Sequence, residues 1–117
     1  MEMKKYIRVA KALSDPSRIK IVKLLQAKGL CVCEIRELLG LAQPTVSKHL
    51  KILEEAGLLE RAKDGQWVNY RLLDGADSTH AKAMLDHLRH SLDSDPEVKQ
   101  LLGRLPFVDR ETICGGR

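Results

Sequence analysis

Two short helical segments separated by a brief turn occupy the middle of this chain and limit its fold more than any other feature. The first is predicted from about Cys33 to Leu39, ending at Gly40, and the second from about Gln43 to Ala56. Polar residues crowd the start of the second segment. Short helices joined in this way, the second beginning with polar side chains, are typical of a helix-turn-helix.

A β-hairpin is predicted directly after the helix-turn-helix. Residues 58–63 are strand-like, Asp64-Gly65 is a strong turn signal, and residues 67–72 supply the returning strand. A helix-turn-helix followed by such a hairpin forms a winged helix. The predicted fold class is therefore mainly α with a small β-hairpin, a winged helix-turn-helix in the order α-α-α-α-β-β-α.

Amphipathic helices are predicted on both sides of this unit. Residues 4–13 carry apolar side chains at helical spacing, and a second helix runs from Asp15-Pro16, an N-cap followed by proline, to about Ala27. Residues 76–92 form a further helix with one apolar stripe. Because a small winged helix cannot bury the stripes of both the first and the last helix, we expect a homodimer that uses these helices as its interface.

The exposed face of the second helix-turn-helix segment has the chemistry of a DNA-reading surface. Val46, Leu50 and Leu53 share one face, which should point to the core. Glutamine can pair bidentately with adenine, and serine, threonine and lysine suit phosphates near a helix N-terminus. The predicted DNA-binding residues are Gln43, Thr45, Ser47, Lys48 and His49 on this helix, with Lys63 and Gln66 in the wing.

The distribution of charge agrees with double-stranded DNA as a partner. The net charge is +4, but residues 1–28 carry eight Lys or Arg against two acids, whereas residues 74–97 carry two against six. A basic half that faces a polyanion and an acidic half that faces away would produce this pattern. Two ordinary solvated helix faces would produce it as well.

The length of 117 residues predicts one folded unit. We expect a winged helix-turn-helix domain for DNA binding and dimerisation over residues 1–95, and a C-terminal extension over residues 96–117. The extension should begin with a short helix to about Leu102 and continue as a mobile tail. No apolar run approaches the ~20 residues of a membrane span, and no apolar stretch follows the charged start as in a signal peptide. The expected location is therefore the cytoplasm.

Cys31 and Cys33 lie at the start of the helix-turn-helix, ahead of its DNA-reading helix, and Cys114 lies near the end of the chain. In a cytoplasmic protein, cysteines indicate free thiols, metal binding or redox sensing rather than a disulfide framework. On a regular helix the spacing of the pair separates the two side chains by about 200°, whereas an extended segment brings them to one side. One soft ion held by both thiolates would therefore bend or unwind the start of the next helix.

The segment LCVCEIRELL, which begins at Leu30, and the segment QPTVSKHL, which begins at Gln43, resemble the ArsR/SmtB family of metal- and metalloid-responsive repressors. The resemblance extends over residues 5–92, and the cysteine pair is similar to that of the arsenic-responsive branch. It implies a homodimeric repressor that is released from operator DNA when trivalent arsenic or antimony binds cysteine thiolates. It also implies the DNA-binding residues named above.

Two positions depart from the family's pattern. Members of the arsenic branch often carry a third cysteine where this chain has Arg36, so the third ligand is either Cys114 or absent. Members also often carry a capping serine or threonine where this chain has Ala42. Loss of that cap would leave the start of the DNA-reading helix less stable by about 1 kcal/mol.

Several alternatives remain open. The same fold would suit a sensor of cadmium, lead or zinc, and His80, His87 and His90 are then further candidate ligands, although their spacing differs from that of zinc-sensing members. The cysteine pair would also suit a redox or persulfide switch, and the helices would suit a protein-binding module. The chain carries no glycine-rich phosphate loop, metalloprotease motif or nucleophile elbow, so an enzyme is not expected.

Overall fold

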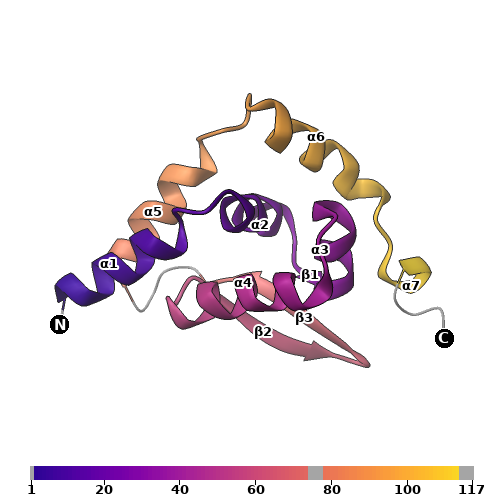
Figure 1. Cartoon of the computed structure of the whole chain (residues 1–117), viewed down its shortest axis with the longest axis horizontal. Coiled ribbons are helices and arrows are strands. Elements are labelled where there is room, and N and C mark those ends of the chain that lie inside the picture. The colour runs from indigo at the N-terminus through magenta and orange to yellow at the C-terminus, as the bar shows by residue number, and fades with distance from the viewer. Residues whose placement is uncertain (1, 74–77, 114–117) are drawn as a thin grey trace.

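The computed structural model describes residues 2–73 and 78–113 of the chain. Helices and strands follow one another closely within these residues (Figure 1). In chain order they are α1 (Glu2–Ala12), α2 (Pro16–Ala27), β1 (Leu30–Cys31), α3 (Val32–Leu39), α4 (Gln43–Glu55), β2 (Leu59–Asp64), β3 (Trp67–Leu72), α5 (Thr79–Arg89), α6 (Pro96–Arg104), the 3-10 helix η1 (Leu105–Phe107) and α7 (Arg110–Ile113).

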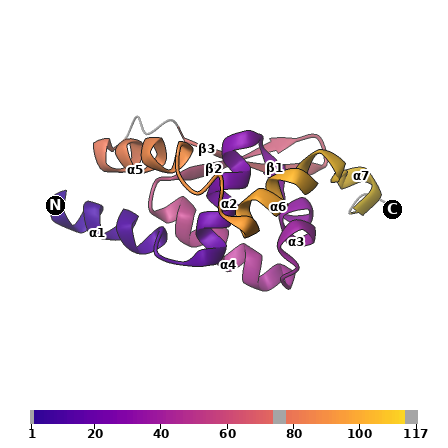
Figure 2. The same cartoon turned by 90° about the horizontal axis from the view of Figure 1, so that it is seen from above.

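Helices α2, α3 and α4 form one packed unit, and the β2–β3 hairpin extends below it in the view of Figure 1. Helices α1 and α5 lie side by side and project together from this unit, as both views show (Figures 1 and 2). Helix α6 packs on α2, and α7 packs on α3. The chain thus places a paired helical arm on one side of the unit and a C-terminal arch over it.

The wing is built from β2 and β3, which pair antiparallel from Leu59 opposite Leu72 to Asp64 opposite Trp67. Gly65 opens the loop with a φ of 64°. A positive φ at this position of a short hairpin is unfavourable for other residues and explains the glycine. The predicted helix-turn-helix and wing are therefore confirmed.

A third strand, β1, extends the wing into a sheet with the order β1-β3-β2. Leu30 lies opposite Tyr70, and Cys31 lies opposite Asn69. A Cβ at Gly29 would come within 3.3 Å of the Tyr70 carbonyl oxygen, so glycine permits this close approach. The sequence did not predict β1 because a strand this short shows no alternation and exists only through its pairing with β3.

Aliphatic side chains fill the core between the helices and the sheet. The largest fully buried ones are Val9, Ile21, Val22, Leu24, Leu30, Ile35, Leu38, Val46, Leu50, Leu53, Leu58 and Leu59. The three residues predicted to turn the DNA-reading helix inward are all among them. The orientation of α4 is thus fixed by apolar packing against the rest of the unit.

The C-terminal segment differs from the prediction of a tail that is mobile beyond Leu102. Helix α6 continues into η1 and α7, and it brings apolar side chains into buried positions. These are Val98, Leu101 and Leu105. Arg104 donates hydrogen bonds from Nη1 to the Leu38 carbonyl (3.0 Å) and from Nη2 to the Glu37 carbonyl (3.3 Å), which lie at the end of α3.

The predicted short helix up to about Leu102 is confirmed by α6. The sequence did not predict η1 and α7, because these pieces depend on contacts with elements far away in the sequence. The division of the chain at residue 95 stays a prediction. None of the helices in the described part of the chain has both the length and the apolar character needed to span a bilayer.

Candidate functional site

The start of α4 presents a polar, solvent-exposed surface. Helix α4 begins after Ala42, which provides no side-chain cap, and Val46 donates its N–H to the Ala42 carbonyl (3.1 Å). The predicted DNA-binding residues that are exposed on this helix are Gln43, Thr45, Ser47 and Lys48. The two predicted wing residues, Lys63 and Gln66, are exposed at the hairpin turn.

His49, by contrast, is partly buried and faces the protein. Its Nδ1 lies 3.2 Å from Arg18 Nη1 and 4.0 Å from Asp15 Oδ2. Arg18 also donates from Nε to the Ala12 carbonyl (2.7 Å) and from Nη2 to the Lys11 carbonyl (3.3 Å). Arg18 therefore joins the end of α1, the start of α2 and the middle of α4. The sequence carried no sign of this role, because it depends on contacts between distant helices.

Asp15 completes this junction as the N-cap of α2, and its Oδ2 accepts the Arg18 N–H at 3.1 Å. Burial acts to raise the pKa of Asp15, but the Arg18 N–H, the Arg18 guanidinium and His49 outweigh it and lower that pKa below its ordinary value. The carboxylate is thus a stable anion between two basic side chains. The predicted N-cap is confirmed.

Cys31 lies at the junction of the sheet and α3. It is the second residue of β1 and also the N-cap of α3, its side chain is 4% exposed, and its thiol is free. The Glu34 carboxylate accepts the Cys31 N–H at 3.0 Å, and the Cys31 sulfur faces the Glu34 N–H in return, which makes a capping box. Glu34 is itself only 5% exposed.

The environment of Cys31 favours its protonated form. Burial raises the pKa of this thiol most strongly, and the Glu34 carboxylate beside it raises the pKa further, against backbone N–H groups that lower it. A buried, protonated thiol is inert until its surroundings open. Glu34 is not among the site residues predicted from the sequence. The spacing Cys31-x-x-Glu34 is nevertheless that of a capping box, with cysteine in place of serine or threonine.

Cys33 occupies a different environment, as the second residue of α3. It is partly buried and disulfide-bonded. Cys114, the third predicted sulfur ligand, lies outside the described residues.

Arg36 stands at the position of the family's third cysteine. It has a buried Nε without a hydrogen-bond partner in the described part of the chain.

The β2–β3 hairpin also contacts the C-terminal segment. Arg110 of α7 donates to Asp64 Oδ2 (2.9 Å) and to Asn69 Oδ1 (3.1 Å), and its guanidinium lies 5.0 Å from the centre of the Trp67 ring. Asn69 is the residue that lies opposite Cys31 in the sheet. The wing, β1 and α7 therefore meet close to the thiol.

The histidines of α5 do not form a metal site in the described residues. His80 Nε2 lies 3.3 Å from Glu2 Oε2, and its ring meets Tyr6 edge-on at 5.1 Å between centroids. His87 and His90 are exposed. Among the residues that the structure describes, no group of three His, Cys, Asp or Glu side chains is placed to hold a metal ion.

Comparison with known proteins agrees with this geometry. Residues 15–61 match the family model described as bacterial regulatory protein, arsR family. The arsenical resistance operon repressor of Escherichia coli (strain K12) is 48% identical over 110 residues, which cover 92% of this chain and 94% of that repressor. This chain belongs to the arsR family.

The names of other relatives of this arsR-family protein refer to resistance to different elements. The cadmium resistance transcriptional regulatory protein CadC homolog of Staphylococcus aureus is 36% identical over 80 residues, covering 68% of this chain and 63% of that protein. The solution structure of the homodimeric winged helix-turn-helix DNA-binding domain Mb0332 from Mycobacterium bovis matches with a TM-score of 0.62 at 29% identity, covering 74% of this chain and 79% of that one. The arsR-family protein is thus a winged-helix transcriptional regulator and not an enzyme.

Proposed function

We propose that this arsR-family regulator is a repressor that binds operator DNA as a homodimer and is released when trivalent arsenic or antimony binds its cysteine thiolates. The observation that carries the proposal is the position of Cys31. Its backbone pairs with the wing strand β3 and also caps α3. A ligand on this sulfur therefore acts on the wing directly and on α4 through α3, which packs against it.

The DNA contact is proposed for the exposed start of α4 and for the wing. Gln43 suits an adenine edge in the major groove, and Thr45, Ser47 and Lys48 suit base edges or phosphates. The wing residues Lys63 and Gln66 would reach phosphate or the minor groove. His49 remains in the proposed set, but its Nδ1 is engaged with Arg18, so only its Nε2 is left for DNA.

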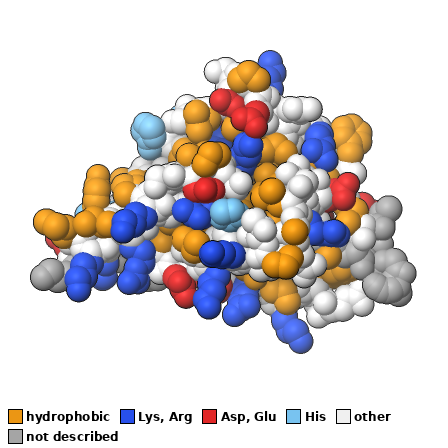
Figure 3. Space-filling view, viewed as in Figure 1, with side chains coloured by type: hydrophobic (Ala, Val, Ile, Leu, Met, Phe, Trp, Pro, Cys, Tyr) orange, Lys and Arg blue, Asp and Glu red, His pale blue; other side chains and the backbone are white. Residues whose placement is uncertain are grey.

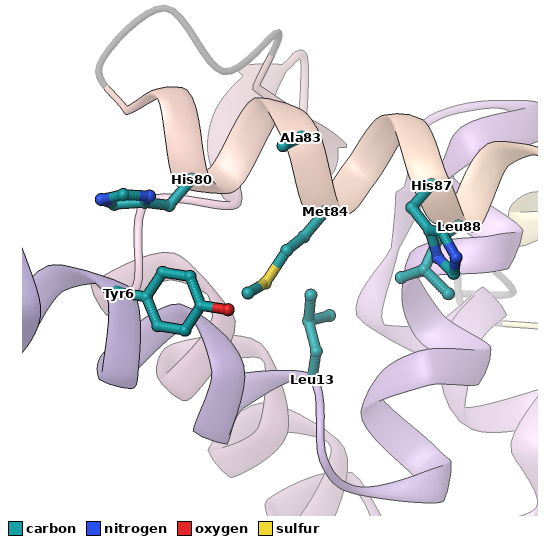
Figure 4. Close-up of a pocket in the computed structure, with 7 residues that line it drawn as sticks. All are labelled: Tyr6, Leu13, His80, Ala83, Met84, His87 and Leu88. Carbon is teal, nitrogen blue, oxygen red and sulfur yellow. The ribbon is translucent and has the colours of Figure 1, made fainter.

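The homodimer is proposed to form through α1 and α5. Met3 and Tyr6 of α1 are 71% and 49% exposed, which is high for large apolar side chains. A shallow pocket lies between the two helices, and Met84 points from α5 toward Leu13 and Tyr6 (Figure 4). A second copy of the same helix pair would cover this apolar surface about a twofold axis.

The inducer is proposed to bind Cys31 and Cys33, with Cys114 as the candidate third ligand. Sulfur donors suit a soft, thiophilic ion better than a hard one. Because Cys33 is disulfide-bonded in this structure, it must be reduced before it can bind. Cadmium, lead and zinc remain alternative inducers.

The route from thiol to DNA follows from what Cys31 holds in place. To serve as a ligand, its sulfur must leave the buried position where it faces the Glu34 N–H. That movement disturbs the start of α3 and the pairing of Cys31 with Asn69 in the sheet. Helix α3 packs on α4, so both DNA-contacting elements are affected. A coupling of about 1–3 kcal/mol would change operator affinity by about 5- to 150-fold.

Fluorescence anisotropy of labelled operator DNA tests this function. Fully reduced protein is titrated with arsenite, antimonite, cadmium and zinc, as wild type and as Cys31→Ser, Cys33→Ser and Cys114→Ser. Arsenite should release the wild type but neither of the first two variants, and Cys114→Ser decides the third ligand. Release by cadmium or zinc and not by arsenite would assign a divalent inducer and reject the metalloid.

A thiol redox switch is a second candidate, because the structure holds Cys33 in a disulfide while Cys31 stays a free thiol. Two thiols that form a disulfide give up two electrons and two protons, and hydrogen peroxide accepts them to become water. Under this alternative, peroxide releases the operator without any metal, and dithiothreitol restores binding. Peroxide that leaves the reduced wild type on DNA would reject it.

A further inference from the structure

Helix α1 carries a row of cations that the DNA-binding elements named so far do not include. Lys4, Arg8 and Lys11 are spaced at i, i+4 and i+7, which places them on one face of the helix, and all three are exposed. We call these residues the basic strip. The apolar residues Met3 and Tyr6, proposed for the dimer, lie on a different face of α1 by the same helical geometry.

The basic strip lines a groove between α1 and α4 that also contains Ile7, Arg18, Ile52 and Glu55. A second hollow at the start of α4 is lined by Arg18 and Ile52 again, together with Thr45 and Lys48. The two hollows share residues, so one continuous surface leads from α1 to the DNA-contacting turns of α4. It is continuous with the proposed DNA interface.

This surface has a surplus of positive charge. Glu55 is the single carboxylate among the described residues that line the two hollows. No side chain of the basic strip forms an ion pair with another described residue, whereas Glu2 at the start of α1 approaches His80 of α5. Figure 3 shows Lys and Arg side chains gathered along the edge where α1 and α4 lie.

We infer that the basic strip binds the phosphate backbone of double-stranded DNA beside the segment contacted by α4. The inference rests on the proposed DNA-binding role of α4. Lys and Arg neutralise phosphates whatever the base sequence, so the strip adds affinity and a steeper salt dependence but no sequence preference. Its position on α1 leaves the opposite face of the helix available for the partner subunit.

The test compares two double variants that lose the same charges. Arg8→Gln with Lys11→Gln removes two members of the strip, and Arg89→Gln with Lys99→Gln removes one arginine and one lysine that are exposed on α5 and α6. Affinity is measured against salt concentration for a random-sequence duplex of several helical turns and for the operator. Each pair removes four charges from a homodimer, so the first pair should lower the salt slope by about four and the control pair by about zero.

The loss of affinity from the first pair should be the same for random and operator DNA. Equal slopes for the two pairs, or a loss confined to the operator, would overturn the inference. A pair that keeps the charges, Arg8→Lys with Lys11→Arg, should keep the wild-type slope. Lys4→Gln alone removes two charges from the homodimer and should lower the slope by about two. Binding to the random duplex depends on the basic strip whether or not arsenite releases the operator. Failure of this inference can therefore be told apart from failure of the proposed function.

Discussion

Cys31 is the residue on which the proposed regulation depends, and its chemistry follows from its burial. The side chain is 4% exposed and lies beside the buried carboxylate of Glu34. Burial has the largest effect and raises the pKa of Cys31 above its ordinary value, and the Glu34 carboxylate raises it further. The thiol is therefore protonated at neutral pH. An inducer that binds this sulfur must replace that proton.

The pH dependence of binding should therefore distinguish a divalent ion from arsenous acid. Cadmium displaces the Cys31 proton, so its affinity should rise with pH by about tenfold per unit for each thiol deprotonated, up to the raised pKa. Arsenous acid supplies hydroxide groups that leave as water with the thiol protons, so its affinity should stay nearly constant near neutral pH. Isothermal titration calorimetry in buffers of different ionisation enthalpy counts the protons. Net proton release with arsenous acid would contradict this prediction.

A second residue-scale prediction concerns acid stability through Asp15. Its lowered pKa means that the ionised carboxylate stabilises the fold above the unfolded-state pKa, and that this contribution is lost as pH falls through the lower folded-state pKa. Asp15→Asn keeps a good N-cap but removes the charge. Urea unfolding should show wild type and variant differing most near neutral pH and converging below about pH 4. A difference that is the same at every pH would refute the assignment.

Helix α3 is the element proposed to link the thiols to DNA, and tertiary contacts hold it at both ends. The Glu34 carboxylate secures its start, and Arg104 of α6 secures its last carbonyls. Gly40 ends it with a φ of 69°, a conformation that glycine adopts without strain. The two ends are thus held independently, so its start can move while its end stays on the core.

Removal of the Glu34 carboxylate tests how firmly the start of α3 is held. Glu34→Ala leaves the buried Cys31 N–H without its acceptor and should lower the free energy of unfolding by about 1–3 kcal/mol. Glu37→Ala, on the same helix but exposed, should change it by less than about 0.5 kcal/mol. Equal effects of the two substitutions in urea denaturation would show that the cap contributes no specific stability.

Local signals explain which elements were predictable from the sequence. Helix α2 has its predicted bounds because Asp15-Pro16 marks its start, and the wing follows from Asp64-Gly65. The apolar spacing of α4 likewise predicted its buried face and hence the exposed polar residues. In contrast, Arg18 and His49 are separated by 31 positions, so their contact depends on how helices pack. The strand β1 and the docking of α6 and α7 were missed for the same reason.

Across the whole molecule, different surfaces serve different proposed partners. The basic strip and α4 form one charged edge, while the apolar side chains of α1 and α5 form the arm proposed for the dimer (Figures 1 and 3). The thiol site lies between the wing, α3 and the C-terminal helices. The sites proposed for DNA, a second copy and an inducer are thus at separate places on one chain.

The dimer arm yields a prediction at this scale. Met3→Glu places a charge on an apolar side chain that is 71% exposed, so the monomer should fold normally while the dimer weakens at least about tenfold. Phe107→Glu, at a position 86% exposed on η1, serves as the matched control and should leave the dimer unchanged. Sedimentation equilibrium measures both. A dimer weakened by the control and not by Met3→Glu would place the interface elsewhere.

The central claim is that occupation of Cys31 and Cys33 is linked to DNA binding. The most direct measurement determines the dissociation constant of arsenite for reduced protein with and without saturating operator, beside that of the operator with and without saturating arsenite. Thermodynamic linkage requires the two ratios to be equal, and we predict a common factor of about 5 to 150, each ligand weakening the other. Ratios of one, with both ligands bound, would contradict the claim.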